Sequence, residues 1–429
     1  MNLQEQIDLV PGLSTAPLWF KEIQAKMIES WKEISEPVVE RVKFQDWPLY
    51  QTELVSKNAL ENPLHYSVQA AIEGKEVTGA QLVHVGNTSV MESMKPELSK
   101  QGVIVMDLFD AMHDYPDLVK EHLFQVIPAD DNRISAYNTA YLNGGVFVYV
   151  PDNVELDEPI EVTLHQDSRY NQAFNKHVLI VVGKHSRIDY LERLTGEGNA
   201  TNTTTIQTEI IAKDGARVKY MAMDTLPANS TTFIQRYARA QRDATIDWAL
   251  GVMNDGDTIE DINTLLEGNG SQTDVSVIGI SDGEQVQGIN SKFVNKGYNS
   301  IGNIFQHGVI LDKASLTFNG IGHILKNAKY ADAQQESRVL MLSDQARGDA
   351  NPMLMIDEFE VTAGHAASIG QIDEEQLYYL MSRGLTEKDA EYLVIRGFLG
   401  QVVTSMPSQD IRREMVEIID GKLSSFHAV

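Results

Sequence analysis

The chain has 429 residues, 42% of them hydrophobic, and its 61 acidic residues against 35 Lys and Arg give a formal net charge of −26. The absence of cysteine excludes a disulfide framework, a thiolate nucleophile and a metal cluster held by the chain's own thiolates. The negative charge argues against nucleic-acid binding, which needs clustered Lys and Arg. No apolar run is long enough for a membrane span, and the first residues lack the basic start of a secretory signal, so we expect a cytoplasmic protein without membrane contact.

The first 130 residues are expected to form a mixed, mostly helical region. Four apolar residues recur at every fourth position and predict the first helix: Trp19, Ile23, Met27 and Trp31. Pro17 fits near the first turn of this helix, where its missing N–H is harmless. A second helix is expected over Leu108 to Leu123, interrupted or restarted near Pro116.

Residues 131–371 have a different texture, in which short β-rich runs alternate with turn clusters. Examples are the runs Val146 to Pro151 and Val178 to Val182 and the turns Lys213-Asp-Gly215 and Glu267-Gly-Asn-Gly270. Within this region no convincing helical pattern appears before residue 370. The region therefore consists mainly of strands and turns.

A five-residue phrase recurs inside this region: a small residue, a spacer, a β-former, a spacer and usually an aromatic residue. Its copies are Ser186-Arg-Ile-Asp-Tyr190, Ala216-Arg-Val-Lys-Tyr220, Ala244-Thr-Ile-Asp-Trp248, the weaker Ser271-Gln-Thr-Asp-Val275, and Ala314-Ser-Leu-Thr-Phe318. Successive copies begin 30, 28, 27 and 43 residues apart, so the last interval holds either an extra half-turn or an insertion.

Recurrence at this period is typical of stacked units that bury their apolar faces on one another. We therefore predict a mainly β protein whose core, residues 131–371, is a right-handed parallel β-helix (β-solenoid). A two-sheet sandwich would explain the strands but not the period. The end edges of such a stack must be capped to avoid pairing with other chains, and the flanking helical regions are placed to do so.

The last residues, 372–429, are expected to form a domain of three short amphipathic helices. Asp373 is suited to cap the first, which ends at Gly384, and Thr386 to cap the second in a capping-box arrangement. Pro407 breaks the chain, and Ser408 begins the third helix. The apolar positions of the three helices are Leu377, Leu380, Met381, Leu393, Phe398, Leu399, Val402, Ile411, Met415, Ile418 and Ile419. One face of this bundle is free to serve a partner.

Enzyme motifs are mostly missing: the chain has no P-loop, no H-E-x-x-H, no G-x-S-x-G and no G-x-G-x-x-G opening a helix. We therefore expect no catalytic activity. None of the eleven histidines forms a local cluster with metal-ligand spacing. His365 is singled out because the small residues of Gly364-His-Ala-Ala-Ser-Ile-Gly370 leave its imidazole uncrowded.

The stretch from Gly308 to Phe398 resembles the SufD members of the SufB/SufD family of iron–sulfur cluster assembly scaffolds. The segments that carry the resemblance, in chain order, are Leu325 to Gln335, Ser337 to Ser343, Asn351 to Ile356, Gly364 to Gly370 and Asp373 to Gly384. The sequence departs from the family pattern at Ser337 and Val339, where asparagines are common, and at Ala363, where some members have cysteine. SufB members carry cysteines thought to hold the nascent cluster, and this chain has none.

The resemblance implies a non-catalytic scaffold subunit that pairs with SufB through the β-helix and binds the ATPase SufC through its C-terminal helices, 373–421. It also implies that His365 is an iron or nascent-cluster ligand at the SufB interface, while the chain alone binds no cofactor. For Gln335 and Arg338 we favour turn or stacking positions inside the solenoid over a functional site, and for Arg383 and Gly384 we favour helix termination over contact with SufC.

Two other functions remain open at this stage. A β-solenoid is also the fold of many carbohydrate-active enzymes, although those commonly have an export signal. A self-associating structural protein is the second alternative, since a SufD-like chain in isolation could form a homodimer through the same β-helix surface. Retention of a SufC-type ATPase in a pull-down separates these alternatives from the scaffold.

Overall fold

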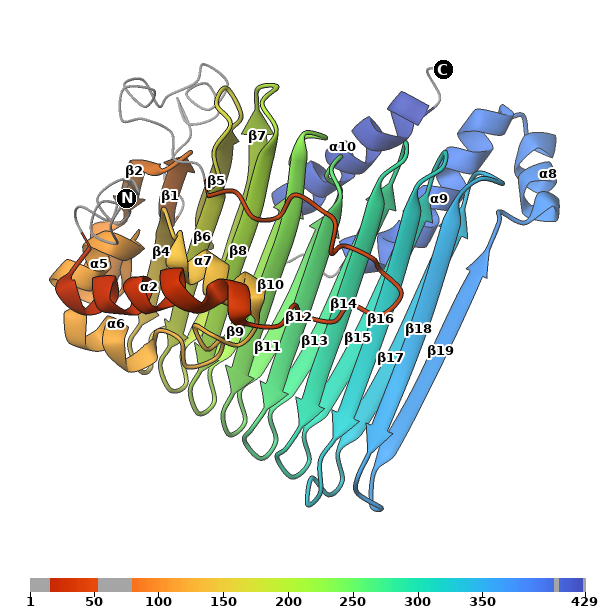
Figure 1. Cartoon of the computed structure of the whole chain (residues 1–429). Helices are drawn as coiled ribbons and strands as arrows, with labels where there is room; N and C mark the ends of the chain where they lie inside the picture. The colour runs from red at the N-terminus through yellow and green to blue at the C-terminus, as the bar shows by residue number, and fades with distance from the viewer. Residues whose placement is uncertain (1–15, 53–78, 405–408, 427–429) are drawn as a thin grey trace.

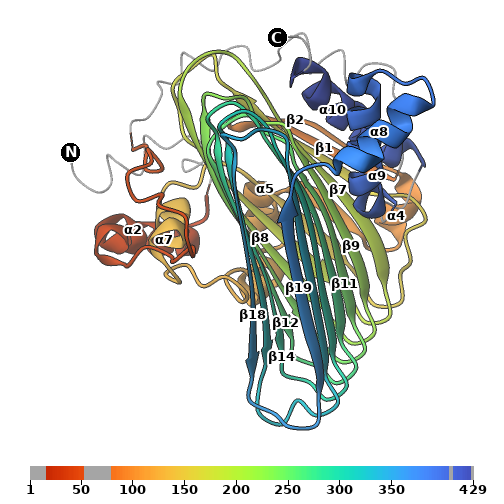
Figure 2. The ribbon, with the colours of Figure 1, turned by 90° about the vertical axis from the view of Figure 1, so that its right-hand side faces the viewer.

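The computed structural model describes residues 16–52, 79–404 and 409–426 and shows a parallel β-solenoid of about eight turns, with 45% of the residues in strands (Figure 1). The predicted parallel β-helix is therefore confirmed. Each coil adds one strand to each of two facing sheets, and an end-on view shows the flattened cross-section that results (Figure 2). Within the described residues, no helix is both long and apolar enough to span a membrane.

The two sheets differ in the strands that they contain. Sheet A consists, in spatial order, of β19 (Thr362–Gly370), β17 (Asp332–Met341), β15 (Ile301–Ile310), β13 (Gln272–Ser281), β11 (Thr245–Val252), β9 (Arg217–Asp224), β7 (Arg187–Glu197), β5 (Ile160–Asp167), β1 (Ala80–Val85) and β2 (Thr88–Met94). Sheet B consists of β18 (Arg347–Ile356), β16 (Ser315–Ile324), β14 (Val286–Asn295), β12 (Thr258–Leu266), β10 (Ser230–Ala240), β8 (Asn202–Ala212), β6 (Phe174–Val182), β4 (Gly145–Val150) and β3 (Ile104–Asp107). The pairs β1–β2 and β3–β4 are antiparallel and close the N-terminal end of the stack.

One corner of every coil is built on a residue with a left-handed backbone conformation. The φ angles of these residues lie between 53° and 71°, and each N–H donates to a carbonyl of the next coil at 2.6–2.9 Å. Glycine and asparagine tolerate this conformation best, which explains the turn clusters seen in the sequence. The corner residues are Asn153, His185, Gly215, Asp243, Gly270, Asn299 and Tyr330.

The recurring phrase marks the strand that follows this corner, because its fifth residues pair in register along sheet A. This rank of residues, in order along the solenoid, is Tyr190, Tyr220, Trp248, Val275, Ile304, Gln335 and His365. The copy at Ala314 to Phe318 instead enters β16 of sheet B. The segment at the equivalent position on sheet A begins at Ser300, half a coil earlier. The long interval therefore holds an extra half-turn, the first of the two alternatives.

The N-terminal helices pack beside the first coils. The predicted first helix is α2 (Leu18–Ser30), followed by the short 3₁₀ helix η1 (Trp31–Glu33), and the helix interrupted near Pro116 is the pair α5 (Leu108–Asp114) and α6 (Pro116–His122). The sequence did not reveal α7 (Arg133–Ala140). All but the first residue of α7 are buried, so it lacks the polar face that would mark an amphipathic helix. The remaining helix is α4 (Pro96–Lys100).

Residues 34–52 cross the outer face of sheet B without regular structure (Figure 1). Four side chains of this strap are buried and pack against Phe233 and Ile259 of the sheet; they are Val39, Val42, Phe44 and Leu49. The strap turns back at Glu40 and Arg41, beside β16 and β18. A surface that would otherwise be apolar is thereby covered.

The three predicted C-terminal helices are α8 (Glu374–Ser382), α9 (Glu387–Val403) and α10 (Gln409–Phe426). Asp373 accepts hydrogen bonds from the N–H groups of Glu375 and Gln376, and Thr386 accepts one from Asp389, so both predicted caps are confirmed. Pro407 and Ser408 lie outside the described residues. The helices α9 and α10 pack on the outer face of sheet A through an apolar cluster that includes Met415 and Leu399.

Candidate functional site

The C-terminal end of the solenoid is open. Neither the outer edge of β18 nor that of β19 pairs with any residue that the structure describes (Figure 2). Strand β8 in the middle of the stack is wholly buried, whereas β18 is only half-buried and most of β19 is exposed. Ile356 and Ile369, which alternate with outward-facing residues, remain 45% and 41% exposed because no further coil covers them. An open β edge with uncovered apolar side chains is a template for another chain.

His365 lies at this open end, on the inward-facing side of β19. Ala363, two residues earlier, packs against the core of the solenoid, and alternate residues of a strand share a face. The Cα partner of His365 on β17 is Gln335. The imidazole is therefore an exposed group at the mouth of the solenoid interior.

The interior beside His365 is polar. Ser337 donates to Gln306 Oε1 at 2.8 Å, and Gln306 Nε2 donates to Ser291 Oγ at 3.0 Å. Gln335 Nε2 donates to the Met353 carbonyl at 3.0 Å, while its buried Oε1 has no hydrogen-bond partner among the described residues. The open end thus presents an exposed imidazole at the edge of a buried polar interior.

The geometry supplies too few donors for a metal centre held by this chain alone. Across residues 16–52, 79–404 and 409–426, no three His, Asp or Glu side chains come together in a way that could hold a metal ion. Imidazole is a good iron ligand, so His365 could contribute one donor to a site completed from another chain.

A second exposed apolar surface lies on the C-terminal helices. None of the residues of α8 is buried. The large apolar side chains that this surface exposes, by 41–76%, are Tyr378, Tyr379, Met381 and Leu393. Arg383 donates to Tyr379 Oη at 3.2 Å and lies over the Tyr379 ring. Exposed apolar patches of this kind mark interaction surfaces.

Polar contacts fix α9 and α10 on sheet A and so hold the α8 surface in place. Arg193 Nε and Nη2 donate to the two carboxylate oxygens of Glu414 at 2.7 and 2.8 Å. Burial opposes the charge of Arg193, but the neighbouring Glu414 and Glu161 outweigh it and raise the pKa of the guanidinium. His307 stacks on Phe398 and lies 2.9 Å from its carbonyl. The helical domain is therefore anchored, and α8 projects from it.

The other residues considered from the sequence have structural places. Gln335 lies inside the solenoid as expected, whereas Arg338 lies on the outer face of β17, where it pairs with Glu336 at 2.9 Å. Gly384 has a φ of +95°, and its N–H donates to the carbonyl of Met381 at 3.0 Å, which ends α8. This geometry agrees with helix termination at Arg383 and Gly384.

A buried charge cluster in the middle of the solenoid was not predicted from the sequence. Arg236 lies between Glu192 and Glu260, and all three side chains are at most 1% exposed. Burial raises the pKa of Glu260 to about 7 although Arg236 opposes the shift. Lys176 is likewise fully buried, and burial lowers its pKa to about 7. A charged residue in a strand is expected to lie on the surface. Its burial becomes visible only when the register between neighbouring coils is known.

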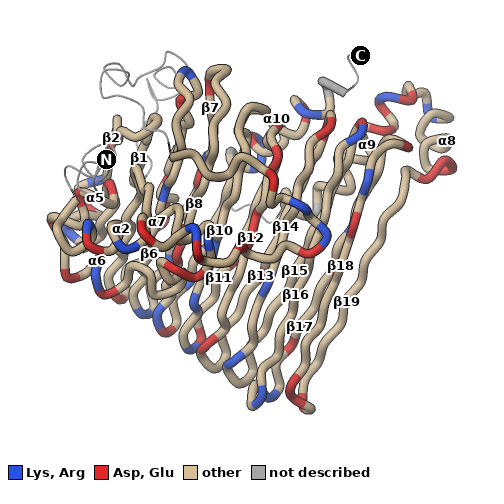
Figure 3. The backbone as a smooth tube through the Cα atoms, viewed as in Figure 1, with Lys and Arg blue, Asp and Glu red and all other residues tan. Residues whose placement is uncertain are grey.

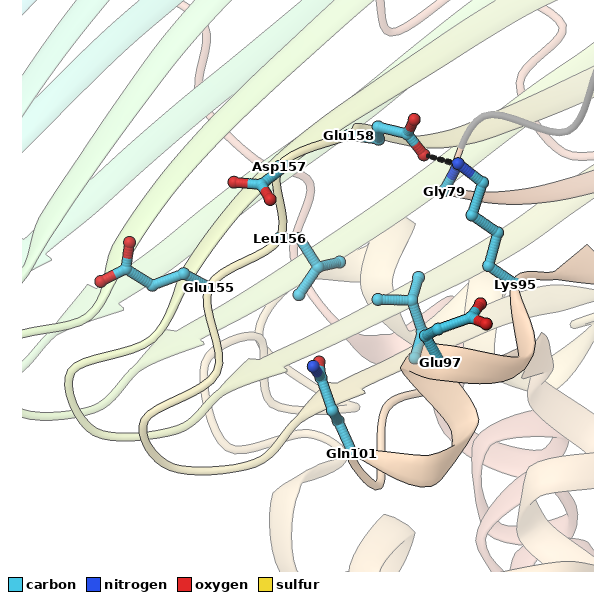
Figure 4. A pocket seen from close by; sticks show the side chains of 9 residues that line it. Gly79, Lys95, Glu97, Gln101, Glu155, Leu156, Asp157 and Glu158 are labelled. Carbon is cyan, nitrogen blue, oxygen red and sulfur yellow. Dashed lines mark hydrogen bonds and ion pairs between the residues drawn. The ribbon is translucent and has the colours of Figure 1, made fainter.

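Concave surfaces elsewhere are weaker candidates for a functional site. A cavity of about 400 Å³ near the N-terminal end is lined by acidic residues, but Glu158 is already bound to Lys95 and to the N–H of Gly79 (Figure 4). Charges of both signs are spread along the turns and helices, with no separate basic face in view (Figure 3). The open end and the α8 surface are therefore the main candidate sites.

Comparison with known proteins identifies the class of protein to which this fold and these surfaces belong. Residues 164–398 match the family model described as SUF system FeS cluster assembly, SufBD core domain, and residues 76–162 match the SufBD protein N-terminal region. The chain belongs to this SufB/SufD family of iron–sulfur cluster assembly proteins.

Its relatives make the assignment more specific. The chain is 39% identical over 417 residues to the iron–sulfur cluster assembly protein SufD of Bacillus subtilis, covering 95% of this chain and 94% of the relative. It is 27% identical over 321 residues to SufBD family proteins of Staphylococcus saprophyticus and Staphylococcus haemolyticus, covering 75% of this chain and 69% of each relative. The chain is thus a SufD-like iron–sulfur cluster assembly protein.

Proposed function

We propose that this chain is a non-catalytic subunit of an iron–sulfur cluster scaffold and works as one part of a three-component assembly. In this proposal a SufB-like subunit extends the solenoid at its open end, and a SufC-like ATPase binds the C-terminal helices. The single observation that carries the proposal is the open end, where uncovered apolar side chains and two strand edges without pairing among the described residues suit the addition of a partner.

The separation of the two exposed surfaces supports two different partners. The open end offers backbone N–H and C=O groups, which suit strand addition. The α8 surface offers aromatic and aliphatic side chains on a helix, which suit a groove or helical face of another protein. Since α9 and α10 bind the outer face of sheet A, a force applied to α8 would be transmitted to the solenoid.

His365 is proposed as a ligand for iron or a nascent cluster shared with the SufB-like subunit. The chain has no cysteine, so any thiolate must come from the partner. A mixed imidazole and thiolate site would bind the cluster less completely than four thiolates do, which suits a cargo that must later leave.

A co-purification experiment with two matched variants tests the assembly. Ile369→Lys places a charge at the open edge, and the double variant Tyr378→Ser with Tyr379→Ser removes the α8 aromatics. We expect Ile369→Lys to lose the SufB-type subunit of the same organism while retaining the SufC-type ATPase, and the double variant to do the reverse. Retention of both partners by both variants would refute the proposal, and so would a wild-type chain that binds neither.

The role of His365 is tested separately. His365→Ala should melt at the wild-type temperature because the side chain is exposed, yet yield less cluster when co-expressed with its partners. Ser368→Ala, at an exposed position facing outward on the same strand, is the matched control. Equal iron and sulfide content in complexes of His365→Ala, Ser368→Ala and the wild type would assign His365 a structural role only.

A further inference from the structure

A rank of polar side chains runs across the outer face of sheet B and stops at the open edge. Its members occupy register-paired positions on β12, β14, β16 and β18: Asp261, Asn290, Asn319 and Asn351. Asn290 donates to Asp261, Asn319 Nδ2 donates to Asn290 Oδ1 at 2.7 Å, and Asn351 Nδ2 donates to Asn319 Oδ1 at 3.0 Å. We call this set the amide ladder.

Asp261, the first member of the amide ladder, sets the orientation of the amide groups that follow. A carboxylate only accepts hydrogen bonds, and Asp261 accepts from Tyr237 Oη at 2.6 Å as well as from Asn290. Each amide therefore turns its NH₂ group toward Asp261 and its oxygen toward the open edge. Asn319 is held in this orientation a second time, because its Nδ2 also donates to the Glu40 carbonyl of the strap at 3.1 Å.

The last oxygen of the ladder, Asn351 Oδ1, consequently faces the strand position beyond β18. Nothing in the described part of the chain donates to this oxygen. Each earlier oxygen in the ladder receives its hydrogen bond from the next strand of the sheet. A strand that extends sheet B would continue the pattern only if it supplied a donor at this position.

We infer that the strand pairing with β18 belongs to a different subunit and carries a hydrogen-bond donor, such as an amide, hydroxyl or ammonium group, opposite Asn351. This inference rests on the proposed function, which places a partner at the open end. It adds the chemistry by which that partner is recognised.

A second copy of this chain fits the ladder poorly. If two copies paired antiparallel about the middle of β18, Asn351 would face Asp349, Asn351 or Met353 of the copy, depending on register. Asp349 offers another acceptor, Asn351 offers its own outward-facing oxygen, and Met353 is apolar. None of these gives the required donor, so the ladder favours a distinct partner over self-association.

Binding measurements with the SufB-type subunit of the same organism test this inference. Asn351→Leu should raise the dissociation constant at least about fivefold, because a hydrogen bond is lost and the partner's donor is left unsatisfied. Asn351→Asp keeps an acceptor toward the partner and should stay within about threefold of wild type. The matched control Asn303→Leu removes the hydrogen bond from Asn303 Nδ2 to Asp274 Oδ1 on sheet A and should leave the dissociation constant unchanged, since Asn303 lies outside the ladder and two strands from the edge of its sheet.

The outcomes separate the inference from the proposed function. If Ile369→Lys abolishes binding but Asn351→Leu binds like the wild type, the partner uses the open end and the amide ladder plays no part in recognition. If Asn351→Asp loses as much affinity as Asn351→Leu, the assigned direction of the ladder is wrong. If Ile369→Lys itself binds normally, the proposed function fails. A wild-type chain that dimerises through β18 more tightly than it binds the SufB-type subunit would also overturn the inference.

Discussion

Replacing Arg236 with Met should strongly destabilise the solenoid, because the guanidinium is the only cation between two buried carboxylates in the described structure. Arg236 Nη2 lies 3.1 Å from Glu192 Oε1, and Nη1 bonds Glu260. Tyr220 Oη lies 3.4 Å from Nε, and the Tyr220 ring stacks on Tyr190. A methionine fills a similar volume but leaves two negative charges without compensation.

The size of this effect follows from the burial of all three groups. Removing one partner of a buried ion pair costs about 3–5 kcal/mol, since the remaining charge has lost its solvation and gained nothing. At about 2.1 cal/mol/K per residue, a chain of 429 residues has an unfolding entropy of about 0.9 kcal/mol/K. The expected decrease in melting temperature is therefore about 3–6 °C. It should be smaller at pH 5.5 than at pH 8, because Glu260, whose pKa burial already raises to about 7, takes up a proton more easily at the lower pH.

Differential scanning calorimetry of three variants provides the assay. Arg236→Met is compared with the triple variant Arg236→Met, Glu192→Gln, Glu260→Gln, which removes every charge of the cluster and should recover at least half of the loss. Arg338→Met breaks an exposed pair with Glu336 and should change stability by no more than about 0.5 kcal/mol. Equal melting temperatures for Arg236→Met and Arg338→Met would refute the reasoning, as would a triple variant less stable than the single one.

Two further predictions concern a buried acid and the helix anchor. Burial raises the pKa of Asp224 to about 6, above its ordinary value of 3.8, so its stabilising contribution is complete below about pH 4 and is lost as pH rises through 6. In thermal melts, the stability of Asp224→Asn relative to the wild type should therefore increase between pH 4 and pH 7. A constant difference in melting temperature across this pH range would contradict the prediction. Met415→Ala should cost about 2–5 kcal/mol of helix docking, because Met415 is fully buried between α10 and sheet A. Limited proteolysis should then cleave the C-terminal helices of Met415→Ala faster than those of the control Met355→Ala, which alters an exposed side chain. Equal cleavage rates would exclude the role of Met415 in helix docking.

The periodic parts of the structure could be predicted from the sequence. The phrase beginning at Ser186, Ala216 and Ala244 recurs because each coil must place a small residue at its corner and an apolar one inside, and that requirement is local to each coil. The caps at Asp373 and Thr386 were equally visible, because a capping side chain bonds N–H groups two or three residues away. The family resemblance is carried by the stretch from Gly308 to Phe398, which contains both caps but not these copies of the phrase.

The candidate site was only partly predictable. His365 could be singled out, but its position at the mouth of the solenoid depends on which coil is the last. The amide ladder and the Arg236 cluster join residues about 30 positions apart, whose register is set by the lengths of all the intervening turns. Helix α7 was missed because burial on nearly every side removed its amphipathic pattern.

Sequence alone therefore determined that the chain stacks strands, ends in capped helices and lacks any thiol of its own, since these properties arise from composition and short-range spacing. Tertiary structure decided which alternating face of each strand is buried, which side chains meet across neighbouring coils and which edge stays open. The physical reason is that a strand's two faces are equivalent until a neighbouring coil covers one of them, and this neighbour is fixed by the whole path of the chain.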